Sequence, residues 1–293
     1  MSDELPKLRM AQPETPEELA HRFERETRPV LLQREASLEN SLAPFRVGSV
    51  PYLNAVPLTR GLEDQIQFVH PSELGRLMAA DQLDAGLVSI TAALFSDRYD
   101  ILDGIAIAAL GEVKSVFLAH RQPLEEMREV LCDPASLASL NLLKVLLAEK
   151  GLHPELKPLS DYAAAPQAEN VFLIGDQALR FVLAKPDHEI WDLGAAWLEL
   201  TNLPFVYAIW ALRRGVPNEP LRRRLREAKS FGMDTLDSII ASYPEFPFDF
   251  RKDYLSWHIH YHLGTDERRA IARFIELLKK HHLGPVYEPR FVV

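Results

Sequence analysis

The chain is poor in cysteine and has no long apolar run. It therefore offers no disulfide framework, no cysteine metal cluster and no membrane anchor. Its 293 residues include one cysteine, Cys132, which excludes an internal disulfide and suits a reducing compartment. The longest apolar runs, such as residues 104–110, are far shorter than the ~20 residues that span a bilayer. Residues 1–7 are acidic rather than apolar, so we expect no signal peptide. These observations predict a cytoplasmic protein with no membrane partner.

The chain also lacks an excess of positive charge, with 33 Lys and Arg residues against 42 Asp and Glu. The formal net charge is −9, which gives no long-range attraction to phosphate backbones, so we expect no nucleic-acid partner. The basic run Arg222 to Arg226 is typical of the solvated face of an amphipathic helix. The sequence contains no Gly-x-Gly-x-x-Gly, Walker, Gly-x-Ser-x-Gly or His-Glu-x-x-His motif. We therefore expect no nucleotide cofactor.

What is present is ample apolar sequence, 47% of the chain against 26% charged residues. This composition supports one large or two moderate domains. Residues 1–44 differ from the rest, because residues 17–40 form a charged segment with helical spacing. We interpret 1–44 as an N-terminal extension without chemistry of its own. It could pack on the main domain or on another subunit, which leaves a homodimer as one expectation, and a loosely ordered extension is the alternative.

From residue 45 onward, short apolar strands alternate with helices. Expected strands are residues 46–50, 87–89, 101–109, 114–120, 129–132, 170–174 and 205–212; expected helices are residues 54–61, 72–80, 90–95, 136–150, 192–201, 218–233, 250–262 and 265–282. Such alternation predicts an α/β fold with parallel or mixed sheets. The block 114–212 is entered and left through strands. We therefore predict that 45–113 and 213–293 form a discontinuous lobe 1, that 114–212 forms lobe 2, and that a ligand binds between them.

Two strand-to-helix turns carry small polar residues that could face such a cleft. Asn54 follows the strand that ends at Val50 and occupies an expected N-cap position. Pro57 removes a backbone N–H that this cap would bind, so the Asn54 side chain is partly free for a ligand. Ser89 ends the next apolar strand in the same way. A plain capping role is the alternative at both positions.

Three further serines are candidate ligand contacts. Ser136 and Ser139 open a helix whose N–H groups and dipole could bind a carboxylate, although capping alone explains them equally well. Ser115 lies where the chain crosses between the predicted lobes, and a hydroxyl there could contact ligand from either side. Asp176 is expected to cap the helix that follows residue 175.

The run His258-Ile259-His260-Tyr261-His262 raises the question of a metal site. On a strand all three imidazoles would share a face, whereas on a helix His258 and His262 would. The surrounding apolar residues favour a helix, and no carboxylate or cysteine is placed to complete a ligand set. We therefore expect no metal here.

Five segments in this order resemble one known family. They are Val47 to Leu58, Asp84 to Ser89, Gly111 to Val116, Ile174 to Leu179 and Asp192 to Trp210. Together they are similar to the chorismate dehydratase family, which opens the futalosine route to menaquinone. The resemblance covers roughly residues 45–282, and the order of the segments makes it specific.

The resemblance implies a two-lobed type II periplasmic-binding-protein-like fold, with the ligand cleft between the lobes, used as a cytoplasmic enzyme. It implies a cofactor-independent hydro-lyase that converts chorismate to 3-[(1-carboxyvinyl)oxy]benzoate and water. Asn54 and Ser89 would be catalytic residues that orient the ring and its leaving hydroxyl. Carboxylate contacts would come from Ser115, Ser136 and Ser139. The motif residues offer no general base, so the substrate's enolpyruvyl carboxylate is our expected proton acceptor.

The sequence departs from the family pattern at one helix start. The family's Ser-Arg-Thr-Ser is here Ser136-Leu137-Ala138-Ser139, which removes a cation and a hydroxyl, and the extension before Phe45 is longer than the pattern requires. Two alternatives remain: a non-catalytic solute-binding protein for a small carboxylate, and the paralogous dihydroxynaphthoate-forming enzyme. The resemblance implies a histidine-containing cleft motif for that second enzyme, and we do not find this motif in the sequence. A ligand-sensing regulator fits poorly, because residues 1–44 are too short for a helix-turn-helix domain.

Overall fold

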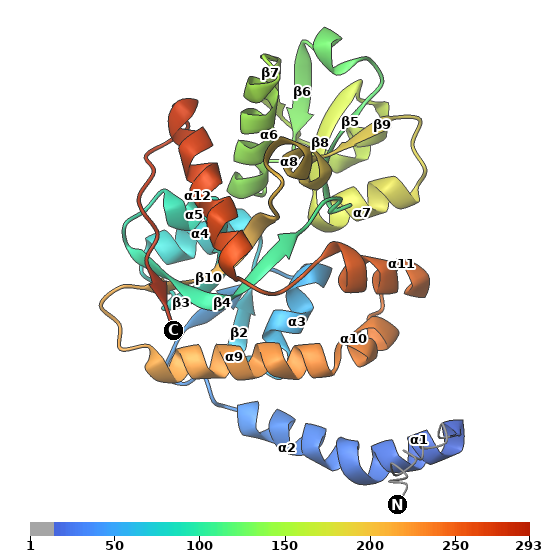
Figure 1. Ribbon diagram of the computed structural model, residues 1–293, viewed down its shortest axis with the longest axis vertical. Coiled ribbons are helices and arrows are strands. Elements are labelled where there is room, and N and C mark those ends of the chain that lie inside the picture. Colours follow the sequence, from blue (N-terminus) through green and yellow to red (C-terminus); the bar gives the residue numbers. More distant parts are fainter. Residues whose placement is uncertain (1–14) are drawn as a thin grey trace, which may run out of the picture.

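Two β-sheets organise the chain in the computed structural model, which describes residues 15–293 (Figure 1). The first has the order β11-β4-β10-β3-β1-β2 and the second the order β7-β6-β8-β5-β9. Helices cover both sheets, which is the layering expected of an α/β chain. Within the described residues, no helix is long and apolar enough to cross a membrane.

The first sheet is mixed. Its strands are β1 (Val47–Ser49), β2 (Ile66–Phe68), β3 (Ala85–Ser89), β4 (Tyr99–Ala109), β10 (Phe205–Arg213) and β11 (Phe291–Val292). Strand β1 pairs in parallel with β2 and β3, while β10 lies antiparallel between β3 and β4. The helices of this lobe are α3 (Val56–Thr59), α4 (Pro71–Ala79), α5 (Ile90–Leu94), α9 (Glu219–Asp234), α10 (Leu236–Ser242), α11 (Phe248–Asp253) and α12 (Thr265–Lys280).

The second sheet belongs to the inserted lobe. Its strands are β5 (Val116–His120), β6 (Glu129–Cys132), β7 (Glu155–Pro158), β8 (Asn170–Ile174) and β9 (Glu189–Asp192), and its helices are α6 (Leu137–Glu149), α7 (Gly175–Leu183) and α8 (Leu193–Thr201). All five residues of β5 are buried. Phe117 packs in a small cluster with Phe181 of α7, whereas Leu118 joins the main core. Since successive strand residues face opposite sides, both faces of this sheet are covered.

The boundary predicted after residue 212 is placed too late. Strand β10 pairs with β3 and β4, so residues 205–213 belong to the sheet of the first lobe. The chain therefore returns from the second lobe between α8, which ends at Thr201, and Phe205. The apolar run of β10 identifies a strand but does not reveal which sheet it joins.

The helix expected over residues 250–262 is also shorter than predicted. Helix α11 is followed by a π-helical turn, η6 (Tyr254–His258), and Ile259 is extended. The backbone N–H and C=O of His260 pair with Ala108 of β4 at 2.8 and 3.0 Å. Because β4 satisfies these groups, the chain leaves the helix before the second histidine of the run, His260. Among residues 15–293, no group of three potential ligands is placed to hold a metal.

The described part of the N-terminal extension is helical. It comprises α1 (Pro16–Arg22), a π-helical turn η1 (Phe23–Thr27) and α2 (Arg28–Leu38), which run beneath α9 in Figure 1. The end of α2 packs on the main body: Leu38 is buried, and Arg34 pairs with Asp234 of α9 at 2.5 Å. Phe23 and Val30 are about half exposed, at 46% and 53%. A second subunit on this arm stays a prediction.

Candidate functional site

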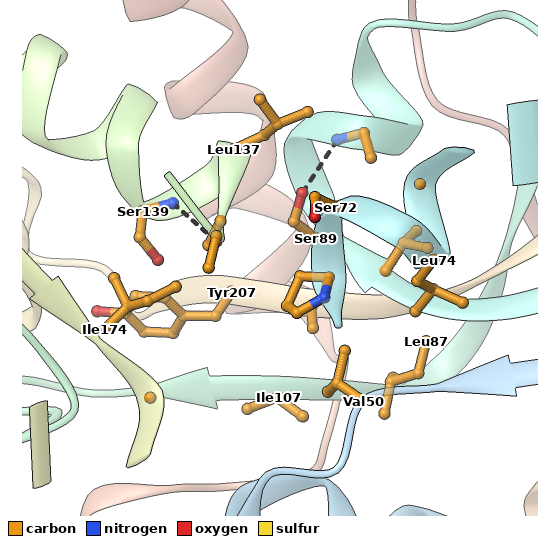
Figure 2. A pocket seen from close by; sticks show the side chains of 18 of the residues that line it. Val50, Ser72, Leu74, Leu87, Ser89, Ile107, Leu137, Ser139, Ile174 and Tyr207 are labelled. Atoms are coloured by element: carbon orange, nitrogen blue, oxygen red, sulfur yellow. Dashed lines mark hydrogen bonds between the residues drawn. The ribbon is translucent and has the colours of Figure 1, made fainter. Parts of the chain in front are cut away.

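A cavity of about 480 Å³ lies between the two lobes. Its volume is in the range of small-molecule sites. Most of its lining is apolar, from side chains such as Val50, Leu87 and Ile174 around the cavity shown in Figure 2. The five residues predicted to contact a ligand all line this one cavity: Asn54, Ser89, Ser115, Ser136 and Ser139.

Ser89 lies at the end of β3 and is the N-cap of α5. Its Oγ accepts a hydrogen bond from the backbone N–H of Ala92 at 3.3 Å (Figure 2). This bond uses the oxygen as an acceptor and leaves the hydroxyl proton free to donate. Ser89 can therefore cap its helix and still donate to a ligand in the cavity.

Ser136 and Ser139 come from the start of α6 in the other lobe. Ser136 is the N-cap, and its Oγ accepts from the N–H of Ser139 at 3.3 Å. Leu137, at the first helical position, is 49% exposed and lines the cavity. Helix α6 has 13 residues, so its N-terminus presents orphan N–H groups and a positive dipole end. Leu137 thus stands at the position where the family pattern has an arginine.

Asn54 does not cap a helix as predicted. It lies inside the 3₁₀ turn η2 (Leu53–Ala55), whose N-cap residue is the extended Tyr52. The Asn54 Nδ2 instead donates to the hydroxyl of Tyr254, at 3.2 Å. Tyr254 in turn donates to Ser115 Oγ, at 2.8 Å. Asn54 and Ser115, which were predicted on separate grounds, are thus joined by Tyr254, a residue that the sequence patterns did not indicate.

Sequence reasoning also missed other polar lining residues, among them Ser72 and Arg98. Ser72 lies in the first turn of α4, and its Oγ is 2.9 Å from His70 Nδ1. The only local signal for it was Pro71, which occupies the first position of α4 and marks the helix start just before Ser72. Arg98 is the one charged side chain among the described lining residues. It pairs with Asp81 at 2.5 Å and donates to the carbonyl of Ala79.

Asp176 connects the lobes beside the cavity. It lies inside the first turn of α7 rather than at its cap, and its Oδ1 accepts from the N–H of Leu53 across the lobes, at 3.4 Å. Burial raises the pKa of Asp176 to about 6, with Glu245 adding to the rise and Arg180 opposing it. The folded chain thus holds this carboxyl in an environment that disfavours its charge.

Asp176→Asn is expected to flatten part of the pH dependence of stability. Since its folded pKa is raised, the folded state binds a proton that the unfolded state has released between about pH 4 and pH 6. The stabilisation from this group is full below the unfolded pKa and is lost as the pH rises through the folded value. The variant should therefore gain stability over the wild type as the pH rises to neutral. Urea denaturation across this range measures it; a difference independent of pH contradicts it.

Comparisons with known proteins agree with this architecture. Residues 45–280 match a family model described as menaquinone biosynthesis. The chain is 31% identical over 268 residues to the chorismate dehydratase of Thermus thermophilus, covering 81% of this chain and 96% of that protein.

Solved structures show the same fold. Protein AF1704 from Archaeoglobus fulgidus superposes with a TM-score of 0.67 at 18% identity, covering 82% of this chain and 98% of that one. The periplasmic aliphatic sulphonate binding protein SsuA from Escherichia coli has a TM-score of 0.56 at 14% identity, covering 85% and 93%. The predicted periplasmic-binding-protein-like fold is confirmed, while identities this low say nothing of the ligand.

Proposed function

The chain belongs to the menaquinone biosynthesis family, and on this premise we propose that it is a chorismate dehydratase. The observation that carries the proposal is the convergence of five predicted polar side chains on one cavity between the lobes. The reaction is the conversion of chorismate to 3-[(1-carboxyvinyl)oxy]benzoate and water, a carbon-oxygen lyase reaction that needs no cofactor. A cytoplasmic location stays a prediction from the sequence.

The chemistry requires a proton acceptor and a departing hydroxyl. A proton leaves the ring carbon that bears the enolpyruvyl ether, where the ring carboxylate acidifies it through conjugation. The hydroxyl leaves from the adjacent carbon, and together they form water as the ring becomes aromatic. The described lining contains no Asp, Glu or His side chain. This supports the substrate's own enolpyruvyl carboxylate as proton acceptor, since positioning alone can make such an intramolecular transfer effective.

The protein's part is then to position groups and stabilise charge. We assign Asn54 and Ser89 to the ring and its leaving hydroxyl, because both lie on the first lobe and present groups that can hydrogen-bond. Ser136, Ser139 and the start of α6 would hold a carboxylate from the second lobe. Ser115 would contact substrate from the crossover between them. Donors fixed before the reaction stabilise the charge that develops on the ring carboxylate.

Leu137→Arg is expected to lower the KM for chorismate about threefold, because a partly exposed cation at the start of α6 adds a charge-assisted contact. Leu137 lines the cavity and is 49% exposed, so the longer side chain has room. Steady-state kinetics measure the change. Leu137→Gln, which adds length without charge, is the control and should leave KM unchanged. An unchanged or raised KM in the arginine variant contradicts a carboxylate subsite here.

The test of the function is direct. Purified protein incubated with chorismate should produce the ultraviolet spectrum of an aromatic product together with one water per chorismate consumed. Saturable binding of chorismate with no spectral change would favour a solute-binding protein instead. The dihydroxynaphthoate-forming enzyme is the other alternative, and the absence of histidine from the described lining counts against the histidine-containing cleft expected of it.

A further inference from the structure

Three polar side chains from distant parts of the chain meet behind the cavity. Asn54 comes from the turn η2, Ser115 from the crossover into the second lobe, and Tyr254 from the π-helical turn η6. Asn54 Nδ2 lies 3.2 Å from the Tyr254 hydroxyl, which lies 2.8 Å from Ser115 Oγ. Single π-helical turns inside helices are frequent at functional sites. Here the turn places a tyrosine between two residues assigned to the substrate.

The structure places the nitrogen of the Asn54 amide toward Tyr254. Tyr254 has one hydroxyl proton and donates it to Ser115, so its oxygen accepts from Asn54 Nδ2. An amide is planar, and its oxygen lies on the side of Cγ away from its nitrogen. Within residues 15–293, no group donates a hydrogen bond to Asn54 Oδ1. Asn54 therefore keeps a carbonyl acceptor and a second N–H for whatever occupies the cavity.

Tyr254 is suited to hold another residue rather than to react. Its side chain is 1% exposed and stacks on Phe250 with ring centroids 6.2 Å apart. Burial raises its pKa, so it remains a neutral hydroxyl. Tyr254 does not line the cavity, whereas Asn54 and Ser115 do. It therefore reaches the substrate only through its two partners.

We propose that Tyr254 is a positioning residue that holds the Asn54 amide with Oδ1 available to the substrate's leaving hydroxyl and ties it to Ser115 of the second lobe. The inference rests on the proposed dehydration. Without the tyrosine hydroxyl the amide can rotate by half a turn, presenting nitrogen where oxygen is needed. Such a loss falls on the chemical step more than on binding, because the carboxylate contacts on α6 are untouched.

The experiment is a double-mutant cycle on chorismate turnover. Tyr254→Phe should lower kcat about five- to tenfold with KM within about twofold, the scale of one lost hydrogen bond. Asn54→Ala with Tyr254→Phe should be no slower than Asn54→Ala alone, since the tyrosine acts through the asparagine. Tyr261→Phe is the matched control: Tyr261 is 4% exposed, and its hydroxyl has no partner among the described residues. Its kcat should match the wild type.

Ser115→Ala removes the other hydrogen-bond partner of Tyr254. Without this acceptor the tyrosine proton is free to turn toward Asn54, so the loss in kcat should not multiply with that of Tyr254→Phe. Loss of the contact that Ser115 itself makes with substrate should raise KM instead. The positioning role is wrong if Tyr254→Phe has the kcat of the wild type. It is also wrong if Tyr254→Phe lowers the kcat of the Asn54→Ala variant by the same factor as it lowers that of the wild type. An inactive wild type would instead overturn the proposed function and this inference together, so the two failures are distinguishable.

Discussion

Replacing Asn54 with alanine is expected to lower kcat for chorismate by about 10²- to 10³-fold, the cost of removing one preorganised group at the reacting centre. Asn54 lines the cavity, and its amide is held by Tyr254. Its loss removes the group that we propose orients the leaving hydroxyl, while the carboxylate contacts proposed on α6 remain. KM should therefore change much less than kcat. Steady-state kinetics followed by the ultraviolet absorbance of the aromatic product measure both constants.

A matched control distinguishes the loss of a catalytic group from a loss of folded protein. Asn218→Ala makes the same change before α9, where the asparagine side chain makes no capping hydrogen bond. Its kcat should equal that of the wild type, and all three proteins should share one circular dichroism spectrum. Full activity in Asn54→Ala would remove Asn54 from the mechanism.

Asp192→Ala should give the largest loss of stability, about 3 kcal/mol or more, because it leaves several buried N–H groups without an acceptor. The Asp192 carboxylate accepts from the N–H groups of Val113 and Lys114 in the crossover, at 3.1 and 2.8 Å. It also accepts from Gly194 and Ala195 at the start of α8, at 2.9 and 3.0 Å. One buried carboxylate thus fastens the crossover that carries Ser115 to the helix of the second lobe.

The crossover and the start of α8 lie close together. A Cβ on Gly194 would lie 2.2 Å from the carbonyl oxygen of Gly111, so the crossover cannot sit against any other residue there without shifting. Urea denaturation measures the free energy of unfolding. Asp161→Ala is the control, since Asp161 caps a single exposed N–H, of Ala163, and should cost about 1 kcal/mol. Equal losses in the two variants would show that Asp192 does not hold the crossover.

Local capping chemistry made part of the site predictable. The helix starts after Ser89 and Ser136 follow from a small hydroxyl residue before an apolar periodic run, and both hydroxyls accept the expected N–H. Asn54 marks the limit of that reasoning. Its partner Tyr254 is 200 residues away, and no local pattern reports a contact made by folding. The cap predicted at Asn54 fails because the chain continues through a 3₁₀ turn before α3.

The sequence predicts where a strand lies better than it predicts which sheet that strand joins. The apolar run of β10 predicts a strand, yet its antiparallel place between β3 and β4 depends on pairing between distant segments. For the same reason the end of the helix before His260 was not predictable, since Ala108 of β4 supplies its backbone partners. The order of the lobes and their cleft followed from the alternation of elements, but the exact return point did not.

We propose above all that the protein catalyses the dehydration of chorismate bound in the cavity between its lobes. Purified protein and chorismate, followed continuously in the ultraviolet and with product identity checked by mass spectrometry, test it most directly. We expect catalytic turnover to 3-[(1-carboxyvinyl)oxy]benzoate without added cofactor, and near-complete loss of turnover in Asn54→Ala. Chorismate that binds stoichiometrically and is recovered unchanged would contradict it.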